Sequence, residues 1–503
     1  MISYLAVVAI LLVSYYVAKA ICSSVVAYRF KRAHGCQPEH KLPQSERILG
    51  LGFYFTFHKT VREKTRIAAG RKRFADNGPT FSTVMMGVKV HSTMDPENIK
   101  AVLATNFSDF GIGQRLRTFG PLLGKGIFST DGAEWKHSRA LIRPSFTRSQ
   151  VADLEIFETH VKHLISKIPR DGSTIDLQPL FFQFTLDAAT EFLFGESVNS
   201  LGSTEGSPQH RFGAAFDYAQ ANLGRQGWID KLTSLFVDSE FTKACKFVHE
   251  FVDRIIDNEL AKKTPADLEK TATFDTQERY IFLEELIRLT QDKKQLRDEL
   301  LNILVAGRDT TASLLSHTFH VLSRRPDLYK KLVTEVSDLD GKIPTYEDIK
   351  SMGYLKNLLR ESLRLYPVVP GNARFANKDT TLPHGGGPDG LSPIYIPKGG
   401  IVNYSVSAMH IRPDIYGPDA TEFRPERWNA EEGLKPGWAY LPFNGGPRIC
   451  VGQQFALVEA SYTIVRMVQE FGKVENRDEL PWTEKIGLTL SIDTGVKVAM
   501  IPV

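Results

Sequence analysis

The chain has few cysteines, no long run of like charge and no evident repeat. Four cysteines occur among 503 residues, none in a CxxC pair, which disfavours a zinc site or a disulfide scaffold and fits a reducing compartment. The net charge of +4 comes without a block of Lys and Arg, so nothing supports a nucleic-acid partner. The GxGxxG-like run Gly385–Gly390 lies among predicted strands and turns, so no nicotinamide or flavin fingerprint is present. The composition is that of a globular protein.

One cysteine, Cys450, lies in a glycine-bounded loop that runs directly into a long amphipathic stretch beginning at Gln453. A thiol near a helix N-terminus is expected to have a lowered pKa, and a thiolate is a soft ligand for a metal or for haem iron. The alternative is a buried structural cysteine. Five spaced identities in the loop distinguish it from an isolated thiol: Phe443, Gly446, Arg448, Cys450 and Gly452.

The N-terminal segment 2–18 is almost wholly apolar, and Lys19 interrupts it before Arg29, Lys31 and Arg32 follow. The pattern predicts a transmembrane signal-anchor over residues 1–28, a basic and proline-containing hinge over 29–45 and a catalytic domain over 46–503. The cationic cluster places that domain in the cytosol. The alternative is a cleaved signal peptide, although no basic residue precedes the apolar core.

The body of the chain is predicted to be mainly α with a smaller β region. Residues 80–93 indicate a strand pair that turns at Gly87, and Asp95 is the expected cap of a helix through Leu103. Helical periodicity dominates from about residue 131 to 365. The polar segment 261–276 is expected to be an exposed loop, and strands return over 382–401.

A long helix predicted from about Lys294 to Leu322 contains the unusual run Ala306-Gly-Arg-Asp309-Thr310-Thr311. Glycine and paired threonines are poor choices inside a helix, and threonine hydroxyls can bond back to the preceding turn and loosen it. The alternative is a simple kink with Asp309 in a surface salt bridge.

Other charged residues occur at helical spacing. Glu361 and Arg364 are three apart on a largely apolar helix, so they can pair, and a buried pair needs a further partner, for which Arg427 is the candidate. Trp135 and Arg139 are four apart on one helix face. Each of these, taken alone, is also consistent with an ordinary core or surface residue.

In their order along the chain, these motifs resemble those of the cytochrome P-450 family, from about residue 80 onward. The resemblance implies the cytochrome P-450 fold, with Cys450 as axial ligand of haem iron and Asp309 and Thr310 delivering protons. It implies that Glu361, Arg364 and Arg427 form a structural lock. The residues that it assigns to haem binding are Trp135, Arg139, Arg374, Phe443, Gly446, Arg448, Cys450 and Gly452.

The resemblance also implies a monooxygenase that inserts one atom of O2 into an unactivated C–H bond of a hydrophobic substrate. Its cofactor would be haem b, and its electrons would come from NADPH through a separate NADPH–cytochrome P-450 reductase, which would dock through basic residues such as Lys136 or Arg143. The chain would be a single-pass protein of the endoplasmic reticulum membrane. Two other classes remain open: a haem-thiolate isomerase or peroxygenase, and a non-catalytic haem sensor.

Three longer stretches narrow the resemblance: 301–315, 382–394 and the cysteine loop continued to Ser461. They look like the fungal and yeast branch that hydroxylates n-alkanes and fatty acids at the terminal carbon, and a hydroxylase of a fungal secondary metabolite is the alternative. The segments 107–119, 368–373 and 488–492 would approach the distal pocket of such a fold. Arg115 or Arg117 in the first of them could hold a fatty-acid carboxylate, unless both are solvated loop charges.

Overall fold

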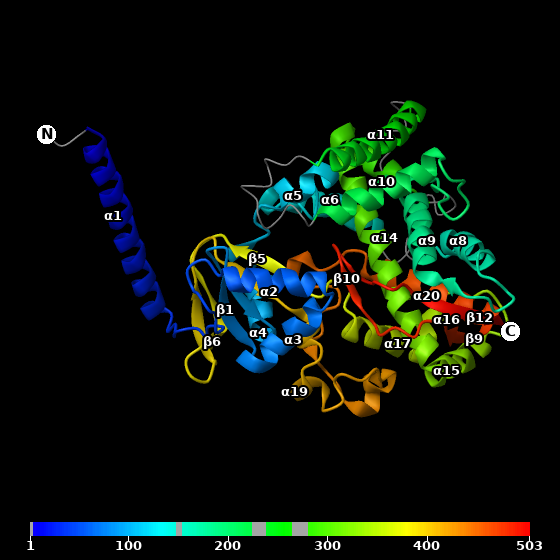
Figure 1. Ribbon diagram of the computed structural model, residues 1–503. Helices are drawn as coiled ribbons and strands as arrows, with labels where there is room; N and C mark the ends of the chain where they lie inside the picture. Colours follow the sequence, from blue (N-terminus) through cyan, green and yellow to red (C-terminus); the bar gives the residue numbers. More distant parts are fainter. Residues whose placement is uncertain (1–3, 147–152, 224–237, 264–279) are drawn as a thin grey trace. The chain divides into compact units, whose positions relative to one another are not determined.

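The computed structural model describes residues 4–146, 153–223, 238–263 and 280–503 (Figure 1). The chain divides into two compact units. The first comprises Met1–Gly111, Gly371–Met409 and Gly445–Arg448, and the second comprises Ile112–Pro370, His410–Asn444 and Ile449–Val503.

The elements of the first unit are α1 (Tyr4–Ala33), α2 (Leu51–Arg62), α3 (Arg66–Asn77), β1 (Thr80–Met85), β2 (Val88–Thr93), α4 (Pro96–Lys100), the π-helix η1 (Ala101–Thr105), η2 (Phe107–Asp109), β3 (Phe110–Gly111), β5 (Asn372–Ala376), β6 (Thr380–Gly386), β7 (Ser392–Ile396), β8 (Ile401–Tyr404), α18 (Val406–Met409) and η8 (Gly446–Arg448).

A five-stranded sheet in the order β1-β2-β8-β5-β3 organises the first unit. Its β2–β8 pair is parallel and the other pairs are antiparallel. The predicted turn at Gly87 is confirmed: Met86 and Gly87 both have positive φ, at 50° and 75°, as a two-residue hairpin turn requires. The predicted cap is confirmed as well, because the Asp95 side chain accepts from the Asn98 N–H at 2.9 Å at the start of α4.

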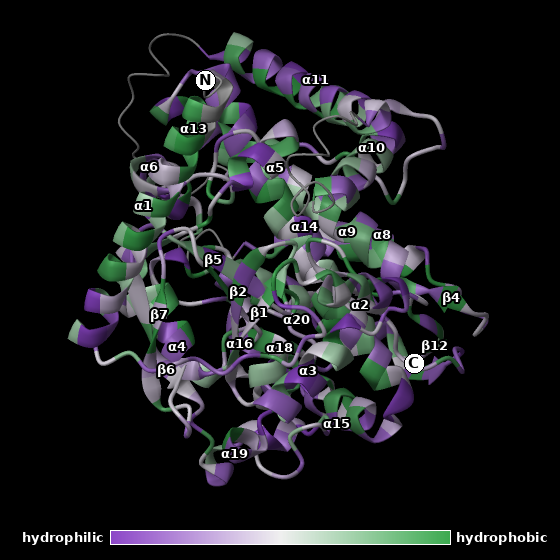
Figure 2. Cartoon of the chain, turned by 60° about the vertical axis from the view of Figure 1, so that its left-hand side comes forward, coloured by the Kyte–Doolittle hydropathy of each residue, from purple (hydrophilic) through white to green (hydrophobic). Residues whose placement is uncertain are grey.

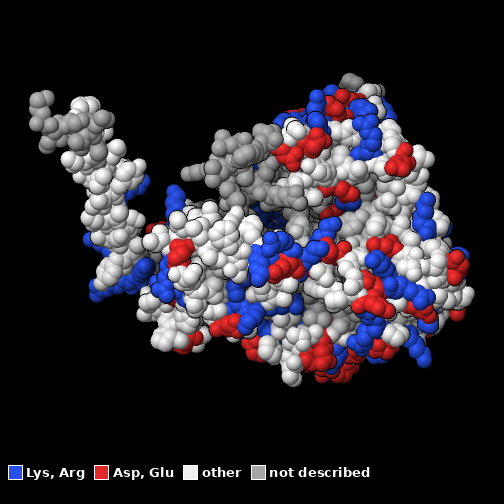
Figure 3. All heavy atoms as spheres, viewed as in Figure 1, with Lys and Arg blue, Asp and Glu red and all other residues white. Residues whose placement is uncertain are grey.

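The N-terminal helix α1 is long and apolar. Residues Ile10–Ala33 have a mean hydropathy of 1.8 with none of that span buried, so the helix could cross a membrane by length and composition. Figure 3 shows its shaft almost entirely free of charge and its end lined with Lys and Arg. The helix continues past residue 28 to Ala33 because it stops only at Gly35, whose φ is +64°. There the Cys36 N–H donates to the Lys31 carbonyl at 2.9 Å, which is the helix-ending pattern that glycine favours.

The larger second unit is mostly helical. Its elements are α5 (Arg115–Leu123), α6 (Gly132–Ile142), η3 (Arg143–Phe146), α8 (Glu155–Ser166), β4 (Ile175–Asp176), α9 (Leu177–Phe194), α10 (Pro208–Leu223), α11 (Ser239–Lys262), α13 (Phe282–Leu289), α14 (Lys293–Arg324), α15 (Pro326–Ser337), α16 (Tyr346–Ser351), α17 (Gly353–Leu365), α19 (Pro413–Tyr416), η5 (Pro425–Trp428), η6 (Ala430–Glu432), η7 (Gly437–Ala439), α20 (Gln453–Glu470), β9 (Phe471–Asn476), β10 (Glu484–Ile486), β11 (Leu490–Ile492) and β12 (Lys497–Pro502).

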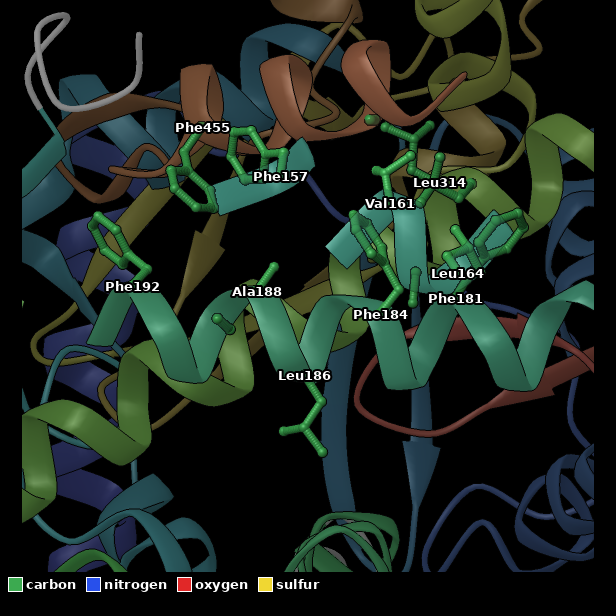
Figure 4. Close-up of a cluster of buried hydrophobic side chains, with 14 of the residues drawn as sticks. Phe157, Val161, Leu164, Phe181, Phe184, Leu186, Ala188, Phe192, Leu314 and Phe455 are labelled. Carbon is green, nitrogen blue, oxygen red and sulfur yellow. The ribbon is translucent and has the colours of Figure 1, made fainter. Parts of the chain in front are cut away.

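The helix α14 runs through the second unit and packs against α9, α20, α11 and α17 (Figure 1). It is buried along most of its length, because its neighbours cover it on several sides. Figure 4 shows the core between α8, α9 and α20, where Phe157, Phe192 and Phe455 face one another. The ring centroid of Phe455 lies 5.2 Å from that of Phe157 and 5.0 Å from that of Phe192. Aromatic contacts of this kind contribute beyond the area that they bury.

The surface helices of the second unit are amphipathic. Figure 2 shows hydrophilic and hydrophobic residues alternating along α11, and its buried side chains recur at helical spacing, as Cys245, Val248, Val252 and Ile256 show. The predicted exposed loop 261–276 lies mostly outside the described residues. The mainly α architecture with a smaller β region is confirmed, and the predicted helix Lys294–Leu322 is realised in α14.

Candidate active site

The loop that carries Cys450 is a tight turn before α20. The Cys450 N–H donates to the Phe443 carbonyl at 3.0 Å, and Asn444 and Gly446 have φ values of +62° and +67°. A Cβ on Gly446 would lie 1.9 Å from the Leu103 carbonyl oxygen, so no side chain fits there. Gly446 is therefore required by a close approach of the backbone to η1, within the first unit.

Gly452 has less steric need to be glycine. A Cβ there would meet only the Phe146 ring at 3.5 Å, an ordinary contact, and its φ of −85° is open to any residue. Its contribution is electrostatic, since its backbone N–H bonds to the Cys450 thiol and favours the thiolate.

The electrostatics of Cys450 differ from the sequence-based expectation. The residue is accessible to solvent on one side, but the protein around the sulfur removes water from the others, and this burial raises the pKa of the Cys450 thiol above its ordinary value. The Gly452 N–H and the positive charge of Arg139 act in the opposite direction and do not outweigh it. The expected net lowering of the pKa was wrong because burial exceeds the effect of the helix terminus. A coordinated metal ion would deprotonate the thiol outright.

Trp135 and Arg139 project from α6 in the same unit as Cys450. Trp135 is buried, and the Arg139 guanidinium lies 6.0 Å from its ring centroid. Burial lowers the pKa of Arg139, and the nearby Cys450 thiolate opposes that shift. The structure therefore brings the α6 pair near Cys450, which lies more than 300 positions later in the chain.

Arg374 and Arg448 belong to the first unit. Arg374 lies on β5 and is buried. Its Nη1 donates to the Ala373 carbonyl at 2.9 Å, and its guanidinium lies 5.8 Å from the Tyr404 ring centroid. Arg448 ends η8 and is half-buried. Both supply positive charge of the kind that binds a carboxylate.

The acid-alcohol pair lies in the middle of α14. The Thr310 hydroxyl donates to the Ala306 carbonyl at 2.6 Å, one turn back. Despite this bond the helix is an unbroken α-helix from Lys293 to Arg324. The continuous helix gives no support to the alternative of a simple kink. Here α14 packs against α9 and α20, and a Cβ on Gly307 would stand 3.7 Å from Ala189 of α9.

Asp309 is buried rather than part of a surface salt bridge. Its Oδ1 accepts from Arg308 Nη1 at 3.0 Å, and its Oδ2 accepts from the Gln220 side-chain amide of α10. Arg308 also pairs with Asp217 of α10. Sequence reasoning missed these partners, although a charged Arg308 inside an apolar helix signals that a partner exists.

A second buried carboxyl group lies beside the threonine pair. Glu459 of α20 hydrogen-bonds the Thr311 side chain, and burial raises the pKa of Glu459 to about 8. No motif points to Glu459, because it occurs at an unexceptional position in an amphipathic helix.

The predicted structural lock is assembled around Glu361. Arg364 donates to both of its oxygens at 2.7 and 2.8 Å, and Arg427 donates to Oε1 at 3.3 Å. The Trp428 indole N–H and the Arg424 backbone N–H also donate to it, at 3.0 and 2.9 Å.

Carbonyl oxygens satisfy the remaining donors of Arg364, and Asp419 with the Tyr416 carbonyl satisfies those of Arg427. A buried ion cluster with every partner present rigidifies its surroundings.

The expected distal segments 368–373 and 488–492 are hydrogen-bonded to each other, and the second is also bonded to α14. The Ser313 hydroxyl donates to the Leu490 carbonyl at 2.5 Å, and the Leu490 N–H donates to the Val368 carbonyl at 2.9 Å. On α5, the Arg115 guanidinium lies 5.8 Å from the Phe119 ring centroid and is half-buried, whereas Arg117 is exposed.

The donor set fits a haem-thiolate site. An accessible thiol precedes an 18-residue helix, and an arginine and a tryptophan lie beside it. A single thiolate can hold haem iron from one side, and an arginine beside it can bind a carboxylate of the macrocycle. These features define the class of protein as one built to carry a thiolate-ligated haem.

Comparison with known proteins gives the family. The cytochrome P450 family model matches residues 50–495, and the chain belongs to that family. Cytochrome P450 52A5 of Candida maltosa is 49% identical over 91% of this chain and 91% of its own length. Cytochrome P450 52A13 of Debaryomyces hansenii is 44% identical over 98% and 96%. Cytochrome P450 monooxygenase himC of Aspergillus japonicus is 44% identical over 93% and 84%.

The protein is therefore an oxidoreductase of the monooxygenase type with the cytochrome P-450 fold. Membership implies a haem-thiolate cofactor, O2, a hydrophobic substrate and electrons from a redox partner. The apolar helix α1 is a candidate membrane anchor.

Proposed function

We propose that the protein hydroxylates the terminal carbon of an n-alkane or a fatty acid. The observation that carries the proposal is its 49% identity to a yeast 52A protein over almost the whole chain, which supports the resemblance of its three long motifs to the alkane and fatty-acid branch. The tailoring of a fungal secondary metabolite is the second candidate, because himC of Aspergillus japonicus and 52A13 are both 44% identical to this chain.

The residues of the haem site have different roles. Cys450 holds haem b, which supplies oxygen binding and oxidation of the C–H bond when it is bound. Trp135, Arg139, Arg374 and Arg448 bind and orient its carboxylates. Of the remaining haem-loop residues, Phe443 and Gly446 shape the turn, and Gly452 donates its backbone N–H to the Cys450 thiol.

Asp309 and Thr310 hold and move protons at the substrate side of α14. The carboxyl group of Asp309 can gain or lose a proton in place, and the Thr310 hydroxyl can donate one while it accepts another. The buried surroundings of Asp309 exclude bulk water from this exchange. Glu361, Arg364 and Arg427 act on folding rather than on turnover.

Electrons come from NADPH through an NADPH–cytochrome P-450 reductase. Lys136 on α6 and Arg143 on η3 are both exposed, and acidic groups of the reductase would be attracted to them. Charge reversal at either position should reduce turnover driven by the reductase and leave peroxide-driven turnover unchanged. Loss of both activities would indicate a defect other than docking.

Residues 1–28 anchor the protein in the endoplasmic reticulum membrane, and residues 46–503 form the cytosolic catalytic domain. The hinge over residues 29–45 begins within α1, which ends at Ala33. The three cationic residues Arg29, Lys31 and Arg32 at the end of the apolar shaft support this orientation. Protease treatment of sealed microsomes should remove the catalytic domain, and its protection would place that domain in the lumen.

The test of the substrate is a product analysis with the full-length protein and its reductase in vesicles. Alkanes and fatty acids of increasing chain length should give terminal alcohols, and Cys450→Ser should give none. Hydroxylation of a polycyclic metabolite, with no product from any alkane or fatty acid, would favour the second candidate.

The fatty-acid carboxylate has its own test. Arg115→Ala should raise KM for a fatty acid several-fold and leave KM for the alkane unchanged, because only the acid can pair with a guanidinium. Arg117→Ala is the matched control, since Arg117 is exposed on the same helix. An equal KM for the acid in Arg115→Ala and the parent would exclude this role.

A further inference from the structure

The helix α10 presents three side chains to the charged turn of α14. Phe216 and Gln220 are four residues apart and Asp217 lies beside them, so all three occupy one side of the helix. Gln220 is buried against Asp309, while the Asp217 side chain is 53% exposed. The turn of α14 that carries the expected proton donor is thus covered by groups from another helix, which lies about 90 residues earlier in the chain.

Arg308 is fixed by more than its ion pairs. Its guanidinium lies 4.9 Å from the ring centroid of Phe182 on α9 and 6.0 Å from that of Phe216, and its Nε donates to the Phe182 carbonyl at 3.4 Å. From this position Nη1 reaches both Asp217 and Asp309. One arginine is therefore shared between an exposed carboxylate on α10 and a buried carboxylate on α14.

Gln220 supplies the second contact to Asp309. Its amide nitrogen donates to Oδ2, while its buried amide oxygen has no hydrogen-bond partner among the described residues. A buried acceptor without a donor is unfavourable. If Asp309 is protonated, the amide can turn over and its oxygen can accept from the carboxylic acid. Gln220 can therefore bind Asp309 in either protonation state.

We propose that Gln220 and Asp217 are positioning residues for Asp309 with opposite effects: Gln220 holds the carboxylate in its pairing with α10, and Asp217 draws Arg308 away from it. The proposal rests on the proposed role of Asp309 in handling protons. Because α10 also packs against α5, which begins in a segment expected near the substrate, a substrate that displaces either helix would change how Asp309 is paired.

The electrostatic effects on the pKa of Asp309 agree with these opposite roles of Gln220 and Asp217. Burial raises the pKa of Asp309, the charge of Arg308 lowers it, Asp217 raises it and the Gln220 hydrogen bond lowers it. Arg308 and Asp217 are the charged groups that face Asp309 from α14 and α10 in the described part of the chain. Removing the Gln220 amide should therefore raise this pKa, and neutralising Asp217 should lower it.

The test is an infrared pH titration of the full-length, haem-loaded protein in nanodiscs. The carboxylic-acid band of Asp309 is identified by its loss in Asp309→Asn. The titration midpoint should rise by about one pH unit in Gln220→Leu and fall by about one unit in Asp217→Asn. Gln209→Leu, at the start of α10, and Glu205→Gln, just before that helix, change exposed residues and should leave the midpoint in place.

A band that shifts in the same direction in both variants, or that does not respond to pH in any of the proteins, overturns the proposal. Haem content by absorbance identifies a variant that has failed to fold. Gln220→Glu then takes the place of Gln220→Leu and should raise the midpoint, because Glu adds a negative neighbour. Asp217→Ser takes the place of Asp217→Asn and should lower it, because Ser removes a negative neighbour.

Turnover with reductase gives a second measurement. Asp217→Asn should enlarge the solvent isotope effect on product formation, because Arg308 then pairs fully with Asp309, and Gln220→Leu should not enlarge it. The infrared titration needs no substrate, so opposite shifts without any alkane or fatty-acid product would refute the proposed substrate and leave the positioning roles intact.

Discussion

Two buried carboxylates of the second unit, Glu361 and Asp309, have different surroundings. Glu361 receives hydrogen bonds from two arginines, an indole and a backbone N–H, and no part of its side chain is exposed. Asp309 shares its arginine with Asp217. Its other partner is Gln220, whose amide oxygen has no hydrogen-bond partner within the part of the chain that the structure describes.

The difference shows how one residue type can serve two purposes. A carboxylate whose oxygens are all saturated by fixed donors locks its neighbours in place. A carboxylate with incomplete and movable partners can change its protonation state at lower cost. The first arrangement suits a structural lock, and the second suits a group that handles protons.

The largest expected effect is at the saturated site. Glu361→Ala leaves two buried arginines without their shared carboxylate, which should cost roughly 3–5 kcal/mol of unfolding free energy and deplete the bound haem. Thermal unfolding and haem content measure it. Glu426→Gln is the control, since Glu426 lies next to Arg427 on the short helix η5 and its carboxylate pairs with Lys331 near the surface. Normal stability in Glu361→Ala would mean that the cluster is not a lock.

The second-largest effect is expected at Asp309, where a substitution should lower the activity and leave the stability unchanged. Asp309→Asn keeps the shape and removes the ionisable group, so product formation should drop by about 10²-fold while the unfolding temperature changes little. Asp257→Asn on α11, where the side chain is half-exposed, is the control. A loss of stability comparable to that in Glu361→Ala would erase the distinction between the two sites.

The fold could be predicted where local pattern and burial agree. Gly87 and Asp95 have local roles, a turn and a cap, and both predictions are confirmed. The apolar spacing of residues 294–322 predicted α14 within two residues at each end. The alternative of a simple kink at Thr310 is not supported, because α14 is continuous there, and its packing against α9 and α20 leaves no trace in the local sequence.

The candidate site divides in the same way. The pairing of Glu361 with Arg364 follows from helical spacing, whereas Asp419 and Trp428, which complete the cluster, occupy no pattern that points to it. The partners of Asp309 were missed because the hydrogen bond from Gln220 spans 89 residues. The predicted direction of the pKa shift of Cys450 was wrong, because the sequence reveals the helix terminus but not the burial of the thiol.

Replacing one arginine of each site, Arg427 or Arg308, by lysine compares the two sites directly. Arg427→Lys should cost about 2 kcal/mol, because an ammonium group cannot replace a guanidinium that bonds Glu361, Asp419 and the Tyr416 carbonyl together. Arg308→Lys should cost less than about 1 kcal/mol, since a lysine can still pair with Asp217, whose side chain is 53% exposed. Chemical denaturation compares them directly. Equal costs would show that saturation of hydrogen bonds does not separate the two sites.

The smallest effect lies at the edge of the saturated cluster and depends on pH. The hydrogen bond from Arg427 lowers the pKa of Asp419 below its ordinary value of 3.8, so Asp419 stabilises the fold above that value, and the contribution is lost as pH falls through the lowered pKa. Asp419→Asn should reduce stability by less than about 1 kcal/mol at neutral pH, because the side chain is partly exposed. The difference from the parent should vanish in acid. A difference that persisted at low pH would arise from lost hydrogen bonds rather than from charge. The edge of the lock would then resemble the contact of Asp309 with Gln220, whose amide donor is uncharged.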